Sequence, residues 1–152
     1  MESKASSTPV GLVDERLAHI VRQLARDFQT CLEEKLHPYG VNHGFWAYLR
    51  ELWNEEGISQ RDLSDRVGLS GPTTNSVVKR MEAAELVELR PIVEGKPRRV
   101  VYLTQRGRDL RAVLEPLAEE VNALAVQQMD AEEVGRLREA LLKVHANLLT
   151  QR

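Results

Sequence analysis

Residues 58–82 constrain the fold of this chain more than any other stretch. Ser59 is a polar residue just before an apolar-periodic run, and Asp62 follows three positions later, which approximates the capping box at the start of a helix. Gly68 can adopt the positive φ that ends such a helix. Leu69 is expected to fill the turn with an apolar side chain. The sequence therefore predicts a short helix that ends in a tight turn.

A second helix is expected directly after this turn. Ser70 offers another N-cap, and Pro72 falls in the first helical turn, where its missing N–H costs little. At about 100° per residue, this helix has two distinct faces. The apolar face holds Thr74, Val77, Val78 and Met81. The opposite face and its flanks hold Pro72, Thr73, Asn75, Ser76, Lys79 and Arg80.

The polar face of this second helix points to a function. Small hydrogen-bonding groups come first, and the cations Lys79 and Arg80 come later. A helix that enters the major groove of DNA needs this order, because its N-terminal residues reach base edges while its cations meet phosphates. The same pattern also suits an ordinary amphipathic helical hairpin with a solvated outer face, so this stretch alone leaves both interpretations open.

The distribution of charge favours the DNA-binding interpretation. The chain has 152 residues, 42% of them apolar and 29% charged, which is typical of one globular domain with a real core. Its net charge of −2 argues weakly against a nucleic-acid-binding protein. However, residues 59–111 hold eleven Lys and Arg against seven Asp and Glu, whereas residues 1–58 and 112–152 each carry −3. Positive charge is concentrated where a phosphate-facing surface requires it.

Other classes of protein are excluded by what the sequence lacks. No apolar run approaches the roughly 20 residues that a membrane helix needs. Residues 1–9 lack the features of a secretory signal, so we expect a disordered tail and a cytoplasmic protein. The histidines are scattered, without the spacing of a zinc site, and no catalytic motif is present. We therefore expect no enzyme activity, no catalytic residues, no metal and no cofactor. The histidines are His19, His37, His43 and His145.

Two β-compatible runs follow the second helix. Residues 86–93 and 99–104 alternate apolar and polar side chains or are rich in β-branched and aromatic ones. Between them, residues 94–98 contain Gly and Pro as turn residues. Two strands joined by a basic tip make a wing beside the helix-turn-helix, which can lie along the DNA backbone or minor groove. The candidate contacts of this wing are Lys96, Arg98 and Arg99.

Long amphipathic helices are predicted on both sides of this region. Apolar residues recur at helical spacing over residues 10–36 and 104–152, with a shorter helix over residues 42–55. Pro116 should kink the last helical region, and Asp130 begins a capping box for its final part. Stripes of this length exceed what a small domain can cover. Pairing them across a two-fold axis in a homodimer would bury both stripes. It would also place the two recognition helices, the second helix of each helix-turn-helix, about one DNA turn apart.

With these elements in place, the chain resembles the multiple-antibiotic-resistance regulator (MarR) family of bacterial transcription factors. The resemblance covers residues 12–149, and its most specific parts are residues 60–70, Pro72–Thr73, residues 77–82 and residues 103–107. It implies a fold that is mainly α with a small β-wing. Residues 10–152 then form a single domain, in which residues 10–36 and 104–152 are dimerisation helices and residues 42–103 are the winged helix-turn-helix region.

The resemblance also implies a homodimeric repressor that binds double-stranded DNA at pseudo-palindromic operators. In the wing, Ile92 and Gly95 stand where many family members have acidic residues. The residues expected to bind DNA, including those of the wing, are Ser59, Gln60, Ser70, Pro72, Thr73, Asn75, Ser76, Lys79, Arg80, Lys96, Arg98 and Arg99.

Many family members release DNA when a small aromatic acid binds between the dimer helices and the winged helix. Residues 45–50 resemble regulators of aromatic-acid metabolism. Such a pocket needs an apolar slot and a donor for the carboxylate. We expect the slot from Tyr39 and Trp46, although core packing also explains a tryptophan. The candidate donors, each equally compatible with a simple surface or backbone-bonded role, are Arg16, His19, His43 and Arg50.

Two alternatives stay open. Cys31 is the only cysteine, so no internal disulfide can form. A lone thiol on a helix is usually inert packing, but it could instead make the regulator responsive to oxidation. The winged helix could also serve protein–protein contact without DNA.

Overall fold

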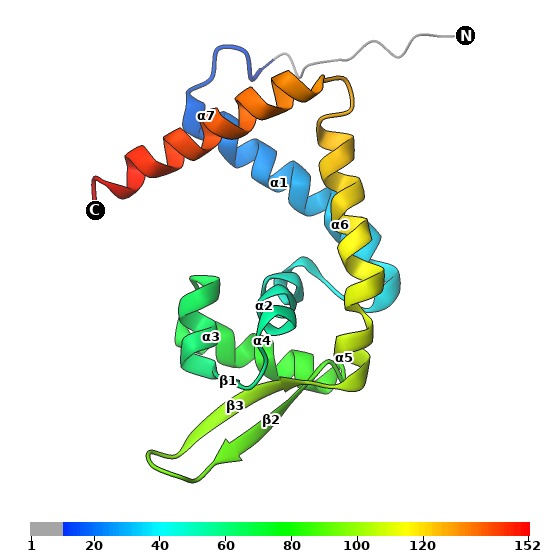
Figure 1. The fold of residues 1–152 in the computed structure, drawn as a ribbon, viewed down its shortest axis with the longest axis vertical. Helices are drawn as coiled ribbons and strands as arrows, with labels where there is room; N and C mark the ends of the chain where they lie inside the picture. The colour runs from blue at the N-terminus through cyan, green and yellow to red at the C-terminus, as the bar shows by residue number, and fades with distance from the viewer. Residues whose placement is uncertain (1–10) are drawn as a thin grey trace. The chain divides into compact units, whose positions relative to one another are not determined.

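The computed structural model describes residues 11–152, so the disordered tail expected over residues 1–9 lies outside the described part. The chain forms two compact units that divide between Ala118 and Glu119. The expectation of a single domain over residues 10–152 stays a prediction. The fold is mainly helical with a small antiparallel sheet, as predicted (Figure 1). In chain order the elements are α1 (Leu17–Leu36), the 3-10 helix η1 (His37–Tyr39), α2 (His43–Asn54), β1 (Ile58–Ser59), α3 (Gln60–Val67), α4 (Gly71–Ala83), β2 (Val87–Ile92), β3 (Arg98–Leu103), α5 (Gln105–Asp109), α6 (Arg111–Ala125) and α7 (Ala131–Leu149).

The core of the first unit surrounds α2. Tyr48, Leu49 and Leu52 are almost completely buried, and α2 contacts α3, α4 and β3. Removal of this apolar surface from water is the main force that holds the unit together. Trp46 and Trp53 are both buried and meet edge to face, with 5.6 Å between ring centroids and an interplanar angle of 77°. Edge-to-face contact is a favoured arrangement of aromatic rings.

The helix-turn-helix forms as the sequence predicts. Ser59 Oγ accepts a hydrogen bond from Asp62 N at 3.0 Å and caps α3. Gly68 ends α3 with a φ of 75°. Ser70 Oγ accepts from Thr73 N at 3.2 Å and caps α4. The predicted apolar face of α4 is confirmed, because all its members are buried: Thr74, Val77, Val78 and Met81.

The expectation that Leu69 fills the turn is wrong. Its side chain is 46% exposed. The turn is closed by a polar contact instead, because the hydroxyl of Ser64, a buried residue of α3, donates to the backbone carbonyl of Leu69. A hydrogen bond to the main chain needs no apolar side chain in the turn, so the pattern of apolar residues could not reveal it.

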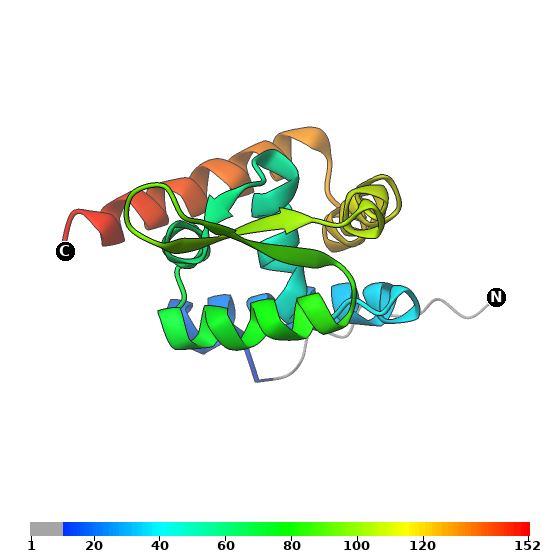
Figure 2. The ribbon, with the colours of Figure 1, turned by 90° about the horizontal axis from the view of Figure 1, so that it is seen from below.

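The hairpin β2–β3 forms where the two β-compatible runs predict it. The strands are antiparallel, with Val87 opposite Leu103 and Ile92 opposite Arg98. A short strand that the sequence did not predict, β1, pairs with the other edge of β3 and gives the order β1-β3-β2. Two residues are too few for a period-2 pattern to appear. Figure 2 shows α4 and the hairpin side by side from below.

The first helix is shorter than predicted. α1 begins at Leu17, whereas the apolar periodicity predicts a helix from residue 10, which lies outside the described residues. Residues 11–15 form turns, and the side chain of Arg16 makes no capping hydrogen bond. Gly11 disfavours a helix, so the helical spacing of the apolar residues before Leu17 is not enough to extend α1 toward the N-terminus.

The last helical region is interrupted earlier than predicted. Thr104 Oγ1 accepts from Gly107 N at 3.0 Å and caps the short helix α5. The chain then breaks at Leu110, and α6 continues through Pro116. Arg111 Nη1 donates to the carbonyl of Trp53 at 2.8 Å. This bond ties the start of α6 to the end of α2, and such long-range contacts are invisible in the helical pattern.

The second unit contains the end of α6 and α7. The capping box predicted at Asp130 is confirmed, since its carboxylate accepts from Glu133 N at 2.8 Å while Glu133 Oε2 accepts from Asp130 N at 2.8 Å. None of the residues of α7 is buried. Its exposed large apolar side chains are Leu137, Leu141, Leu142, Leu148 and Leu149.

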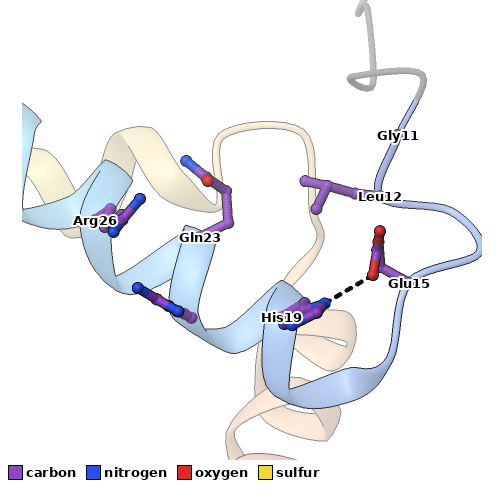
Figure 3. Close-up of a pocket in the computed structure, with 7 residues that line it drawn as sticks. Gly11, Leu12, Glu15, His19, Gln23 and Arg26 are labelled. Atoms are coloured by element: carbon purple, nitrogen blue, oxygen red, sulfur yellow. Dashed lines mark hydrogen bonds and ion pairs between the residues drawn. The ribbon is translucent and has the colours of Figure 1, made fainter.

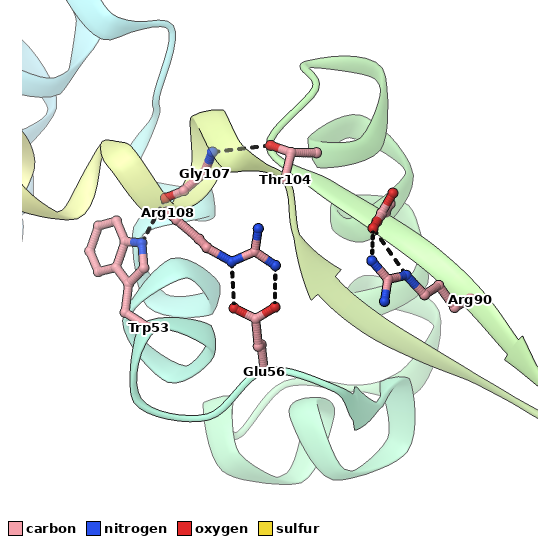
Figure 4. Close-up of polar contacts among 7 residues, drawn as sticks. Trp53, Glu56, Arg90, Thr104, Gly107 and Arg108 are labelled. Carbon is pink, nitrogen blue, oxygen red and sulfur yellow. Dashed lines mark hydrogen bonds and ion pairs between the residues drawn. The ribbon is translucent and has the colours of Figure 1, made fainter.

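Gly107 marks a very close approach of two backbone segments. A Cβ on this residue would lie 2.2 Å from the carbonyl oxygen of Leu86. The same oxygen accepts from Thr104 N at 3.0 Å. On the other side, Trp53 Nε1 donates to the carbonyl of Gly107 at 2.8 Å (Figure 4). Only a glycine allows α5 to lie this close to the chain that follows α4.

Replacement of Gly107 with alanine is expected to lower the free energy of unfolding by about 2 kcal/mol or more, because the added methyl group overlaps a backbone oxygen. Gly135 in α7 is the matched control, since nothing lies within 4 Å of the position its Cβ would take. There, Gly135→Ala should raise stability by about 0.5–1 kcal/mol. Urea unfolding followed by circular dichroism measures the free energy of unfolding of both variants. Changes of the same sign in the two variants would contradict the close approach of Gly107 to the Leu86 carbonyl.

Candidate nucleic-acid interface

The helix α4 presents the polar face that the sequence predicts. Ser70 Oγ and Thr73 Oγ1 lie 2.8 Å apart in its first turn. Hydroxyl and amide groups therefore stand at the N-terminal end of the helix, with the cations one to two turns later. The exposed side chains of α4 and its cap include every residue predicted to bind DNA there: Ser70, Pro72, Thr73, Asn75, Ser76, Lys79 and Arg80.

The rotation of α4 about its own axis is fixed by its buried face. Thr74 is fully buried, and its Oγ1 lies 3.1 Å from the hydroxyl of Tyr48 on α2. A polar pair inside an apolar contact has to be satisfied, so Thr74 must face Tyr48 while Val77 and Val78 enter the core. Sequence reasoning did not single out Tyr48, because nothing in the spacing of α2 distinguishes it from the apolar residues around it.

The wing presents cations on both of its faces. Gly95 adopts a φ of 78° in the turn between β2 and β3. Lys96, Arg98 and Arg99 are all exposed. Arg98 and Arg99 are consecutive in β3, so their side chains point to opposite faces of the hairpin.

The structure separates ten of the eleven cations of residues 59–111 into two sets, and the eleventh, Arg106, donates to backbone carbonyls. Carboxylates pair with one set: Arg66, Arg90, Arg108 and Arg111. Within residues 11–152, the second set has no carboxylate partner, and it contains all five cations predicted to contact DNA, together with one residue of α3: Lys79, Arg80, Lys96, Arg98, Arg99 and Arg61. Cations without such partners keep their positive potential available for phosphates. Sequence reasoning missed Arg61, which only its exposure and lack of a carboxylate identify.

Three predicted contacts have particular surroundings. Ser59 is already used as the cap of α3. The side-chain nitrogen of Gln60 is buried and has no hydrogen-bond partner among the described residues. The guanidinium of Arg80 lies 5.8 Å from the ring centroid of Phe45, a cation–π contact that orients it at the side of α4. Contact of each of these residues with DNA stays a prediction.

Paired charges hold the base of the wing. Glu56 accepts two hydrogen bonds from Arg108, at 3.0 Å from Nε and 2.6 Å from Nη2 (Figure 4). This bonding lowers the pKa of Glu56 below its ordinary value of 4.5 and raises the pKa of Arg108. Arg90 pairs with Glu88, and its guanidinium lies 4.1 Å from the ring centroid of Tyr102. These cations are therefore occupied within the protein.

A similar pair lies beside α3. Arg66 Nη2 lies 2.7 Å from Glu55 Oε2. The hydrogen bond that Arg66 donates to the carboxylate of Glu55 raises the pKa of Arg66. Arg66 is thus tied to the end of α2.

The residues expected to bind an effector do not converge within one chain. Arg16 and His19 lie at the start of α1, whereas Tyr39 lies beyond its end, roughly 30 Å along a helix of this length. Trp46 is buried against Trp53. The other two candidates lie on α2, where His43 is half-buried and Arg50 is exposed. A role in ligand binding stays a prediction for all six.

His19 lies instead in a shallow depression of 470 Å³ along the start of α1 (Figure 3). Its Nδ1 is 2.8 Å from Glu15 Oε2. Arg22 and Arg26 also line this depression. A second depression of 420 Å³, lined by Thr30, Glu33, Glu34 and His37, is acidic and unsuited to a carboxylate ligand. Cys31 is half-buried on the same helix.

No group of three or more His, Cys, Asp or Glu side chains within residues 11–152 is placed to hold a metal ion. None of the helices in that range is both long and apolar enough to cross a membrane.

The sequence and fold can be compared with those of known proteins. The model of the winged helix-turn-helix DNA-binding family matches residues 49–88, which run from the middle of α2 through α4 to the start of β2. The HTH-type transcriptional regulator TtmR of Methylorubrum extorquens (strain PA1) is 25% identical over 118 residues, which are 78% of this chain and 60% of that protein. This chain therefore aligns with less than two thirds of that relative's length.

Solved structures share the fold. A MarR transcriptional regulator from Methanosarcina mazei Go1 superposes with a TM-score of 0.80 at 23% identity, covering 89% of this chain and 97% of that one. MepR of S. aureus, solved in complex with DNA, gives a TM-score of 0.80 at 18% identity, covering 88% and 99%. The predicted winged helix-turn-helix fold of the MarR type is confirmed. These relatives are transcriptional regulators and not enzymes.

The pair Glu56–Arg108 predicts a pH dependence of stability. Because folding lowers the pKa of Glu56, its contribution is fully present above the unfolded value of 4.5 and is lost as the pH falls through the folded value. Glu56→Gln should therefore cost about 0.5–1 kcal/mol at neutral pH, and this difference should shrink progressively below pH 4.5.

Urea unfolding of wild type and Glu56→Gln between pH 3 and pH 7 measures the difference in free energy of unfolding across the pH range in which a carboxylate titrates. Arg108→Gln serves as the partner control and should reduce the same pH dependence. A difference that stays constant through acid pH would contradict the role assigned to the pair.

Proposed function

We propose that this chain, which has the winged helix-turn-helix fold of the MarR-type transcriptional regulators, is a sequence-specific DNA-binding repressor that acts in the cytoplasm as a homodimer. The observation that carries the proposal is the separation of its cations. The cations on α4 and in the wing have no carboxylate partner within residues 11–152, whereas those at the base of the wing are paired. The free cations lie where phosphates would approach a helix that reads DNA.

In the proposed complex, α4 enters the major groove. Thr73, Asn75 and Ser76 face base edges and give specificity, while Lys79 meets a phosphate. The wing lies along the backbone or minor groove, where Lys96 and one of its arginines add further contacts. Repression follows if the bound dimer occupies DNA that the transcription machinery needs.

Exposed apolar stripes support the homodimer. Along α1 the residues Leu17, Val21, Leu24 and Phe28 are each at least 39% exposed and recur at helical spacing. In the second unit, α7 exposes a further set of leucines. Contiguous apolar surface of this kind marks an interaction site in a globular protein. A second copy of the chain would cover both stripes and place two recognition helices on successive turns of DNA.

A small aromatic carboxylate is the proposed effector. Because the candidate residues do not converge within one chain, the binding site needs the partner subunit to complete it. Such a ligand would bind more tightly to a dimer in which the two DNA-reading helices are badly spaced. It would then weaken operator binding, and operator DNA would weaken ligand binding by an equal free energy.

Fluorescence anisotropy on DNA from upstream of the protein's own gene tests this function. We expect tighter binding to that DNA than to a scrambled duplex, a steep dependence on salt, and release by benzoate- or cinnamate-type acids. Specific binding that no acid weakens would remove the effector from the proposal. Release by peroxide that Cys31→Ser abolishes would favour oxidation as the trigger. Equal affinity for scrambled DNA would favour a protein partner for the winged helix.

Lys79→Met should weaken binding to all duplexes to a similar degree and reduce the slope of log K against log salt by about 1, because one phosphate contact is lost. Lys143→Met on α7 is the matched control, since Lys143 is exposed on the face opposite the leucine stripe. Anisotropy titrations at several salt concentrations measure both slopes. A slope for Lys79→Met equal to that of the control would exclude Lys79 from the phosphate contacts.

Leu24→Glu should convert the dimer to a monomer, because burying an unpaired charge in the α1 stripe costs about 3 kcal/mol or more. Arg22→Glu changes charge on the other side of the same helix and should leave the dimer intact. Sedimentation equilibrium gives the mass of each variant. If Leu24→Glu stays dimeric, α1 does not form the interface.

A further inference from the structure

Three consecutive carbonyls that follow α4 accept hydrogen bonds from the beginning of α5. The carbonyl of Leu86 accepts from Thr104 N at 3.0 Å, and that of Glu85 accepts from Thr104 Oγ1 at 2.6 Å. The carbonyl of Ala84, the C-cap of α4, accepts from Arg106 Nη1. The last carbonyls of a helix have no partner within it, and a cation is favourable there. The end of the recognition helix is therefore held by α5.

Arg106 also reaches a second element. Its Nη2 donates at 3.2 Å to the carbonyl of Tyr39, the last residue of η1, which directly follows α1. Gly40 leaves room for this contact, because a Cβ there would lie 3.3 Å from Nη2. One guanidinium thus joins the end of η1, which directly follows α1, to the end of α4.

The neighbours of Arg106 do not make this link. Thr104 binds the turn after α4, and Arg108 binds Glu56 in the loop before β1. Both contacts stay within the winged helix-turn-helix. Among these three side chains, Arg106 is therefore the one that binds η1, and it adds to the packing of α1 on α2.

We propose that Arg106 is a positioning residue that sets where the recognition helix stands relative to α1. The inference rests on the proposed function. If α1 pairs with its copy across a two-fold axis, the geometry of α1 and α4 fixes the separation of the two recognition helices, which DNA reads as the spacing of its half-sites. A planar guanidinium can donate to two carbonyls in a fixed geometry, whereas an ammonium on a flexible stem is a single point charge.

Arg106→Lys keeps the charge and removes the fixed fork. Spin labels on exposed positions of α1 and α4, Gln29→Cys and Asn75→Cys in a Cys31→Ser background, report the distance between the two helices. Dilution with unlabelled protein restricts the signal to distances within one chain. We expect a narrow distribution with Arg106 and a broadened or shifted one with Arg106→Lys. Arg108→Lys is the matched control and should keep the narrow distribution.

Operator spacing gives the functional readout. Duplexes selected by the wild-type protein from a random library are remade with one base pair inserted between the half-sites, and the ratio of affinities for the two versions is measured. Arg106→Lys should reduce this ratio about fivefold, within the range of typical coupling between sites, while Arg108→Lys should not. Thermal unfolding midpoints of the two variants separate positioning from general loss of stability.

Arg106→Gln supplies a second variant if the lysine protein folds poorly. An unchanged distance distribution in both Arg106 variants overturns the proposal, as does an unchanged spacing ratio. If the wild-type protein selects no DNA at all, the proposed function fails, and the distance measurement alone still decides whether Arg106 links α1 to α4.

Discussion

The contact of the Gly107 backbone with the Leu86 carbonyl is the constraint on which the rest of the first unit depends. It brings α5 against the chain that leaves α4, so the end of α4, the base of the wing and the beginning of the last helices meet at one place. Trp53 secures this junction from the opposite side through its indole N–H. The core around α2 then needs only ordinary apolar packing, because the backbone at its edge is already fixed by hydrogen bonds that water cannot easily replace.

Charge is arranged by pairing as well as by position. A chain with a net charge of −2 can offer a basic surface because some of its cations are neutralised locally and others are not. Arg108 and Arg90 neutralise acidic side chains at the base of the wing. The positive potential is left at Lys79 and at the wing tip. Glu94 is the one acidic residue of that tip, and it moderates a charge that would otherwise attract any polyanion.

Local signals in the sequence identified the helix-turn-helix correctly. Ser59 and Gly68 act as caps through bonds to neighbours a few residues away, which residue type and spacing reveal. The failures concern contacts between distant segments. Strand β1 exists only because β3 offers it an edge. In the sequence, nothing distinguishes Arg106 from an ordinary surface arginine. Its two carbonyl partners belong to Ala84 and Tyr39, which lie in separate parts of the chain, so local residue spacing cannot reveal them. The effector residues are a different case, because a helix of the predicted length already separates Arg16 from Tyr39 by roughly 30 Å.

The exposed stripe of α1 has a consequence for the life of the protein in the cell. If that surface is covered only by a second copy, part of the free energy of folding is supplied by association, and the fraction of folded chains then rises with concentration. Newly made subunits at low abundance would spend more time with Leu24 and Phe28 accessible, which is the state that proteases recognise. The abundance of the regulator would thus influence its own turnover, independently of any ligand.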